Sequence, residues 1–285
     1  MSDILARLDH ALMCAESADD DQLTPASQAA DSTRIGEYSW HDALITALEQ
    51  HRFSLSAQPL HDLSGALLHH EACLTLHDVS GTDPVPASIF MPPAVRLGLS
   101  AECDIQAIRL GLDWLFTHDG ALTVPVSLAT LAQGSFFARL ERMLGDRPAL
   151  TTRLILEVDA AGLVEQGADV RQLCDIVTGA GGRVGVSRLS QQFGAMEYLH
   201  EFPVSYVTLS GSFISGLLHS PGSQHLAATV VATAMTLDMA VYAADVPDTA
   251  TQLVLEQIGV RAISGAVVNS GDAQDLAHDH QWVPS

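Results

Sequence analysis

The feature that most constrains this chain is a regular alternation of short strand-like runs with helical stretches, which begins at Arg52. Such alternation is typical of a parallel sheet whose strands are joined by crossover helices. Eight strands in such an order predict an α/β fold, a TIM-type (β/α)8 barrel with its chemistry at the carboxyl ends of the strands. Periodicity alone also leaves a doubly wound sheet open. The predicted strands span residues 53–58, 66–76, 122–127, 153–158, 183–186, 206–209, 240–244 and 262–263.

Helical periodicity fills the intervals between these runs. In the stretch 102–116, Ile105, Ile108 and Leu112 recur at spacings of three and four and form one apolar helix face. The other predicted helices of this region span residues 134–144, 169–179, 224–237 and 249–258.

The N-terminal part of the chain has a different character. Residues 1–17 place Ile4, Leu8 and Leu12 on one side of a short amphipathic helix. Residues 18–38 are rich in Asp, Ser, Ala and Gln and predict a flexible linker. We therefore divide the chain into a helix (1–17), a linker (18–38) and a barrel (39–285) whose first helix begins at Trp40.

Composition excludes several classes of function. The formal net charge is -21 and the chain contains no Lys, which argues against general nucleic-acid binding and rules out any mechanism with a catalytic lysine. No run approaches the roughly 20 apolar residues of a membrane-spanning helix, and no secretory signal opens the chain. We expect a soluble cytoplasmic protein without membrane insertion. Its four widely spaced cysteines are expected to be free thiols.

The string AQPLHDLSGALLHHEACLTLHD at 57–78 is similar to the opening of EAL domains, which belong to the cyclic-di-GMP phosphodiesterase family. The family's Glu-Ala-Leu triplet corresponds here to Glu71-Ala72-Cys73. The resemblance covers roughly residues 49–268 and implies the EAL type of barrel. Further similar segments follow in the family's order: VPASIFMPPAVRLGL (85–99), LTVPVSLATL (122–131), RLILEVD (153–159), FGAMEYLHEFPVSYVTLSGSFI (193–214) and IGVRAISGAVV (258–268).

The leading helix carries a second resemblance. Its sequence LARLDHALMCAE resembles the last helix of a GGDEF domain, which commonly precedes an EAL domain. The chain is therefore compatible with being the cytoplasmic end of a larger sensor protein.

In active family members two divalent cations hold the attacking water, and the resemblance shows which of their ligands this chain retains. Hard cations require several oxygen ligands. Glu71 and Glu157 remain, but Pro125 stands where the family has a metal-binding Asn. Ser187 and Arg188 replace the paired aspartates of the DDFG motif. We therefore predict no bound metal and no other cofactor.

The remaining family positions have also changed. Thr208 stands at the position of the family's Lys, and Asp245 is displaced by one residue from a family carboxylate. The family's Gln-Gly pair appears as Ser264-Gly265. These departures predict that the chain has no catalytic residues and does not hydrolyse cyclic-di-GMP.

Three hypotheses follow from the resemblance. The favoured one is an inactive EAL domain that works as a regulatory interaction module, bound to a protein partner or to a second copy through residues near 193–218. The second is a receptor that binds cyclic-di-GMP weakly without cutting it, and the third is an active phosphodiesterase. We also expect Arg188 to bond to Glu71 or Glu157 and to fill the cation site. Candidate ligand-binding residues are Gln58, Glu71, Pro86, Arg188, Ser264 and Gly265.

Overall fold

The structure is a computed structural model, and it describes residues 37–77 and 84–266. The predicted helix at 1–17 and the linker up to residue 36 lie outside the described residues. The first described helix, α2 (Glu37–Glu49), begins three residues before Trp40, inside the predicted linker. The division into helix, linker and barrel stays a prediction, because residues 1–36 lie outside the described residues.

The strands follow one another across the sheet in sequence order, β1-β2-β4-β5-β6-β7-β8-β9, with β3 paired to β2. A doubly wound sheet would reverse its strand order at a switch point, and this order contains no reversal. The fold is of the (β/α)8 barrel type, as the alternation predicts. The strands are β1 (Phe53–His61), β2 (Leu67–Leu76), β3 (Val85–Pro86), β4 (Leu122–Pro125), β5 (Leu154–Asp159), β6 (Arg183–Ser187), β7 (Tyr206–Leu209), β8 (Ala240–Ala243) and β9 (Ala262–Ile263).

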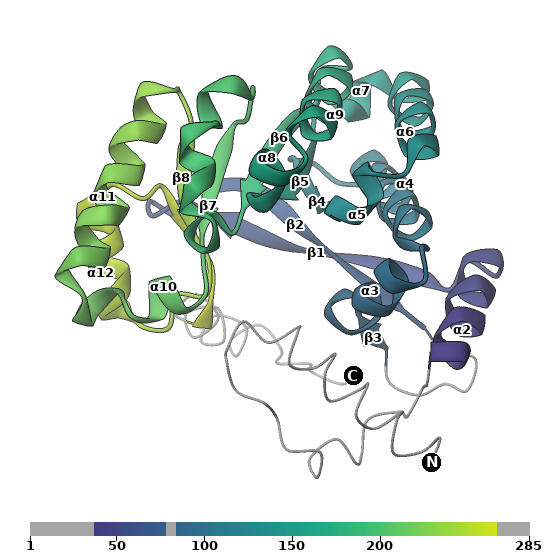
Figure 1. The fold of residues 1–285 in the computed structure, drawn as a ribbon, viewed down its shortest axis with the longest axis horizontal. Coiled ribbons are helices and arrows are strands. Elements are labelled where there is room, and N and C mark those ends of the chain that lie inside the picture. The colour runs from purple at the N-terminus through teal and green to yellow at the C-terminus, as the bar shows by residue number, and fades with distance from the viewer. Residues whose placement is uncertain (1–36, 78–83, 267–285) are drawn as a thin grey trace, which may run out of the picture. The chain divides into compact units, whose positions relative to one another are not determined.

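The chain divides into two compact units, and the first contains most of the N-terminal half. In this unit α4 packs on β4, and α6 packs on α9 (Figure 1). Its core includes Phe90, Ile108 and Leu140, each fully buried. The helices of this unit are α2, α3 (Ala87–Arg96), α4 (Ser100–Thr117), α5 (Leu128–Leu131), α6 (Gly134–Asp146), α7 (Pro148–Thr151) and α9 (Gly167–Gly179).

The second unit contains β6 to β9 and the helices that follow them. Strands β7 and β8 pair in parallel, and α11 packs on β8 and on α12 (Figure 1). Short 3-10 turns span Leu189–Gln191 (η1), Phe193–Glu197 (η2), Leu199–Glu201 (η3) and Leu217–His219 (η4). The α-helices of this unit are α8 (Ala161–Glu165), α10 (Ser212–Ser215), α11 (Pro221–Thr236) and α12 (Thr249–Ile258).

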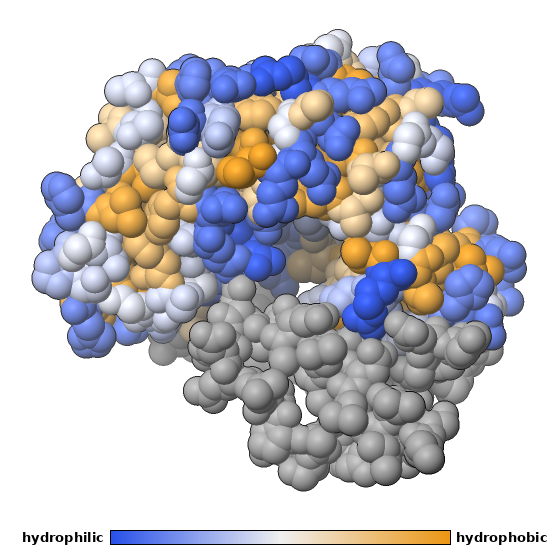
Figure 2. Space-filling view, in the orientation of Figure 1, coloured by the Kyte–Doolittle hydropathy of each residue, from blue (hydrophilic) through white to orange (hydrophobic). Residues whose placement is uncertain are grey.

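The region around α11 is unusually poor in charge. No Asp, Glu, Lys or Arg occurs between Phe202 and Leu237, and Met235 on α11 is 72% exposed. On the left of Figure 2, apolar residues reach the surface over the position of α11. Within the part of the chain that the structure describes, no helix is long and apolar enough to cross a membrane.

The described cysteines are free thiols, as expected. Cys103 and Cys174 are buried, and Cys73 is half-buried. Burial raises the pKa of Cys103 and of Cys174 to about 12. These two thiols are therefore protonated and unreactive at neutral pH.

Candidate functional site

In the first unit the retained glutamates lie on two strands that flank β4. Glu71 on β2 is level with Thr123 on β4, and Pro125 on β4 is level with Glu157 on β5. Thr123 and Pro125 are two residues apart on one strand, so their side chains point to the same face. The register therefore places both glutamates on one face of the sheet, separated along the strands by a step of roughly 7 Å.

In the second unit Ser187 ends β6 and Thr208 lies near the end of β7. Gly185 is level with Tyr206 and Val186 with Val207, so the same register brings Ser187 level with Thr208. The carbonyl of Ser187 accepts a hydrogen bond from the Ala160 N–H at 2.9 Å. These substituted positions therefore lie side by side at the carboxyl ends of adjacent strands.

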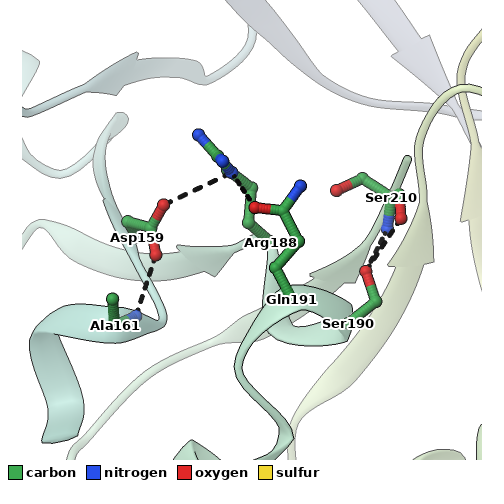
Figure 3. A network of polar contacts seen from close by, with 6 residues as sticks. All are labelled: Asp159, Ala161, Arg188, Ser190, Gln191 and Ser210. Atoms are coloured by element: carbon green, nitrogen blue, oxygen red, sulfur yellow. Dashed lines mark hydrogen bonds and ion pairs between the residues drawn. The ribbon is translucent and has the colours of Figure 1, made fainter. Parts of the chain in front are cut away.

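Arg188 follows β6 in a left-handed conformation, with φ 58°. This conformation is uncommon for a residue other than glycine. The Nε of Arg188 donates to Oε1 of Gln191 at 2.6 Å and lies 3.4 Å from Oδ2 of Asp159 (Figure 3). Asp159 in turn accepts the N–H of Ala161 at 2.8 Å through Oδ1. The guanidinium therefore joins the turn after β6 to the turn after β5.

A second polar contact fixes the turn after β7. The Ser190 hydroxyl accepts the Ser210 N–H at 2.9 Å and donates to the Ser210 carbonyl at 2.8 Å (Figure 3). The Ser210 hydroxyl is buried without a hydrogen-bond partner. Asp245 accepts the Gly211 N–H through Oδ2 at 3.0 Å. Asp245, predicted as a displaced remnant, thus contacts the main chain after β7.

Ser264 and Gly265 follow β9 and pack against the turn after β8. The Val246 N–H donates to the Ser264 carbonyl at 3.0 Å. Gly265 has φ 134°, and a Cβ there would lie 2.4 Å from the Val246 nitrogen. Only glycine fits this close approach of two main-chain segments. Gly265 therefore has a structural role, whether or not a ligand binds nearby.

The two other predicted ligand positions belong to β1 and β3. Gln58 on β1 is exposed, and so is Pro86, which directly precedes α3. Contact of Gln58 or Pro86 with a ligand stays a prediction. Convergence of Glu71 and Glu157 with Ser187 and Thr208, and pairing of either glutamate with Arg188, join residues of different units and also stay predictions.

An aromatic cluster of the second unit joins residues of β7 and β8 to His69 of β2. The Tyr206 ring lies 4.5 Å from that of Tyr242, and the His69 ring stacks on Tyr206 at 5.6 Å. All three side chains are buried. Tyr206 is two residues before Thr208 and shares its face of the sheet. The buried cluster therefore lies on the same face of the sheet as Thr208, two residues before it along β7.

Sequence reasoning missed Asp159, Gln191 and the main-chain contacts of Ser210. Asp159 could have been found, since it follows Glu157 by two residues and strand alternation puts both side chains on one face. No periodic signal marks Gln191 or Ser210, because both lie in turns whose geometry depends on tertiary contacts. Within residues 37–77 and 84–266, no group of three or more His, Cys, Asp or Glu side chains is arranged to hold a metal ion.

The class of protein follows from the fold and the position of these residues: a (β/α)8 barrel-type domain with polar side chains at the carboxyl ends of its strands. A family model described as EAL domain matches residues 41–270. The chain therefore belongs to the EAL domain family, as its motifs predict.

Known proteins with similar sequences or folds are distant relatives. The probable cyclic di-GMP phosphodiesterase PdeA of Escherichia coli K12 is 22% identical over 241 residues, which are 83% of this chain and 32% of that protein. The chain thus spans about a third of the length of this curated relative.

Two solved structures show the same fold. The S helix-GGDEF-EAL region of Vibrio cholerae LapD bound to c-di-GMP has a TM-score of 0.83 at 19% identity, covering 93% of this chain and 65% of that one. The FimX EAL domain of Pseudomonas aeruginosa bound to c-di-GMP has a TM-score of 0.72 at 22% identity, covering 79% of this chain and 93% of that one.

Proposed function

We propose that this chain is a catalytically inactive EAL domain that works as a regulatory interaction module in cytoplasmic cyclic-di-GMP signalling. Membership of the EAL family supports the signalling context. Family membership alone does not establish activity, because a fold can keep its architecture while its chemistry is lost. The residues at the strand ends are the argument against hydrolysis.

The observation that carries the proposal is the charge at the end of β6. A two-cation site needs several oxygen ligands from carboxylates and amides. The chain instead has Arg188, a permanent cation, paired at 3.4 Å with Asp159. Two unit charges of like sign 4 Å apart repel by about 4 kcal/mol at an effective dielectric constant of 20. A divalent cation beside this guanidinium would be repelled more strongly.

The other substitutions reduce the donor set further. Pro125 has no side-chain oxygen, and Ser187 and Thr208 offer neutral hydroxyls in place of charged groups. The residues present therefore do not fit the family's pair of cations, and we derive no catalytic step through them.

Binding of cyclic-di-GMP without hydrolysis is the alternative function. The solved EAL domains of LapD and FimX were determined with this ligand. Against tight binding, the nucleotide carries two phosphates while the chain carries a net charge of -21 and no Lys. Arg188 is already engaged by Asp159 and Gln191. We therefore expect weak binding.

Self-association or a protein partner would account for a domain retained without chemistry. The charge-poor stretch from Phe202 to Leu237 supports this part of the proposal, because a surface without charges can meet a second acidic chain without direct repulsion. It overlaps the segment 193–218, where the family resemblance places pairing of EAL domains. Analytical ultracentrifugation across a concentration series measures this association.

The decisive experiment incubates the purified chain with cyclic-di-GMP and either Mg²⁺ or Mn²⁺ for hours and separates the products by chromatography. We expect no linear dinucleotide. Calorimetric titration with the same ligand, with and without Mg²⁺, is the companion measurement. Metal-dependent turnover that disappears in Glu71→Ala would establish a phosphodiesterase, and micromolar binding independent of metal would establish the receptor.

A further inference from the structure

The first unit contains a buried acid that the proposed function does not use. Asp104 lies in α4, and its side chain is inside the core with only 4% of the residue exposed. Carboxylates are rarely buried to this extent unless they are paired, because removal of a charge from water is costly.

The two hydrogen bonds of Asp104 both come from the segment that follows β4. Its Oδ2 accepts the N–H of Ser127 at 2.9 Å and the hydroxyl of Thr130 at 2.6 Å. Thr130 is fully buried. Ser127 directly precedes α5, and Thr130 lies within it. A single carboxylate oxygen of α4 therefore holds both the β4–α5 turn and the first turn of α5.

No cation compensates Asp104 among the described residues. The strand β4 (LTVP) and the helix α5 (LATL), which pack on α4, carry no ionisable side chain. Two arginines on other elements are paired elsewhere, Arg139 of α6 with Glu102 and Arg147 with Asp113. On α4 itself, Arg109 donates to Gln106. The other ionisable side chains of α6 are exposed: Glu141, Arg142 and Asp146.

The remaining ionisable groups near this helix do not offset the charge. Cys103, the adjacent residue, is a buried thiol whose own pKa is raised. Arg96 of α3 is exposed, as are His41, Asp42 and Glu49 of α2. Burial is the largest influence on Asp104 and raises its pKa from 3.8 to about 6, although the bonds from Thr130 and Ser127 lower it.

We propose that Asp104 is a proton-operated anchor of the β4–α5 turn. Protonation removes the cost of a buried charge without a cation, so the turn opens less readily when Asp104 is protonated than when it is ionised. This turn directly follows Pro125, at the carboxyl end of a central strand. The anchor would therefore control the order of one edge of the site, independently of whether the site binds a nucleotide.

The direction of the effect follows from proton linkage. Because the pKa of the buried acid is higher than in an opened turn, the extra stability is fully present below about 3.8 and is lost as pH rises through about 6. Between pH 5 and pH 7.5 the opening equilibrium of the turn should rise about tenfold. Above pH 7.5 it should change no further.

Hydrogen exchange of the full chain, read as protection factors so that the intrinsic pH dependence is removed, tests the anchor. We expect the amides of residues 127–131 to lose about tenfold protection between pH 5 and 7.5. In Asp104→Asn, which keeps an oxygen acceptor without a titrating proton, this change should vanish. In Thr130→Val, which removes one donor to the ionised acid, the change should extend to higher pH.

Two results would overturn the anchor. One is a set of amide protection factors for residues 127–131 that differ by less than about twofold between pH 5 and pH 7.5 in the wild-type chain. The other is an Asp104→Asn variant that keeps the tenfold change. If Asp104→Asn does not fold, the Thr130→Val comparison decides, because an unchanged pH dependence in that variant also contradicts the proposal.

Discussion

Substitution of Gly185 by Ala should destabilise the second unit through a single contact. Gly185 on β6 is level with Tyr206 on β7, and the tyrosine ring lies across the glycine. An added Cβ would be 2.3 Å from Cζ, 2.6 Å from Oη and 2.7 Å from Cε1 of Tyr206. Carbon atoms normally approach to about 3.5 Å, so the ring would have to move by more than 1 Å.

The surroundings of Tyr206 leave little room for that movement. The residue is 2% exposed, and its ring packs against those of Tyr242 and His69. Overpacking of a close-packed core costs about 1–3 kcal/mol, and the rigid aromatic cluster places Gly185→Ala toward the upper part of that range. For a domain of this size, 2 kcal/mol lowers the melting temperature by roughly 4–8 °C. Urea and thermal unfolding followed by circular dichroism measure the change.

A matched glycine and a double variant complete this test. Gly179 ends α9 with nothing within 4 Å of an added Cβ, so Gly179→Ala should be neutral or stabilise by up to about 1 kcal/mol. Tyr206→Val removes the atoms that clash, and in the double variant the cost of Gly185→Ala should largely disappear. Two results would refute the packing argument. One is a double variant whose loss of unfolding free energy equals the sum of the two single losses, and the other is a Gly185→Ala protein whose unfolding free energy lies within about 0.5 kcal/mol of wild type.

Two further predictions concern the site. Arg188→Ala removes the ion pair with Asp159, in which the Arg188 side chain is 51% exposed and the Asp159 side chain 29% exposed. The free energy of unfolding, measured by urea titration, should therefore fall by less than about 1 kcal/mol. A loss well above that range would contradict the assignment of this pair as a surface ion pair. Arg188→Asp combined with Pro125→Asn should increase the affinity for Mn²⁺, measured by calorimetry, relative to either single variant. Equal affinities in all three proteins would contradict the proposed cause of metal exclusion.

The order of the strands could be predicted from the sequence, because every strand except the two-residue β3 falls within an apolar run between helical stretches. The two-residue strand β3 was missed, since Val85–Pro86 is too short to show any period. Helix α3 was missed as well, because its Pro92 and Pro93 are usually helix breakers. The structure keeps both prolines inside this helix, with Phe90, Pro93 and Ala94 buried.

The candidate site was predictable only as a set of strand-end positions. Family order located Ser187 and Arg188, but the partner of Arg188 in the second unit, Asp159, lies 29 residues earlier in the chain. The left-handed backbone of Arg188 has no signature in its neighbours, since such conformations usually appear in sequence as glycine or asparagine. Asp104 likewise looks like an ordinary helix acid until its burial is known.

At the strand ends of the second unit, side-chain oxygens hold the main chain of the turns. The Ser190 hydroxyl bridges both main-chain groups of Ser210, Asp245 holds Gly211, and Asp159 holds Ala161. The Ser190 and Asp245 bonds each join the turns that follow two neighbouring strands, with a side chain in place of a neighbouring backbone, whereas the Asp159 bond lies within the turn after β5. None of these bonds uses the side chain of residue 187, 188 or 208, so these three side chains could be exchanged while the turns of the second unit keep their main-chain contacts.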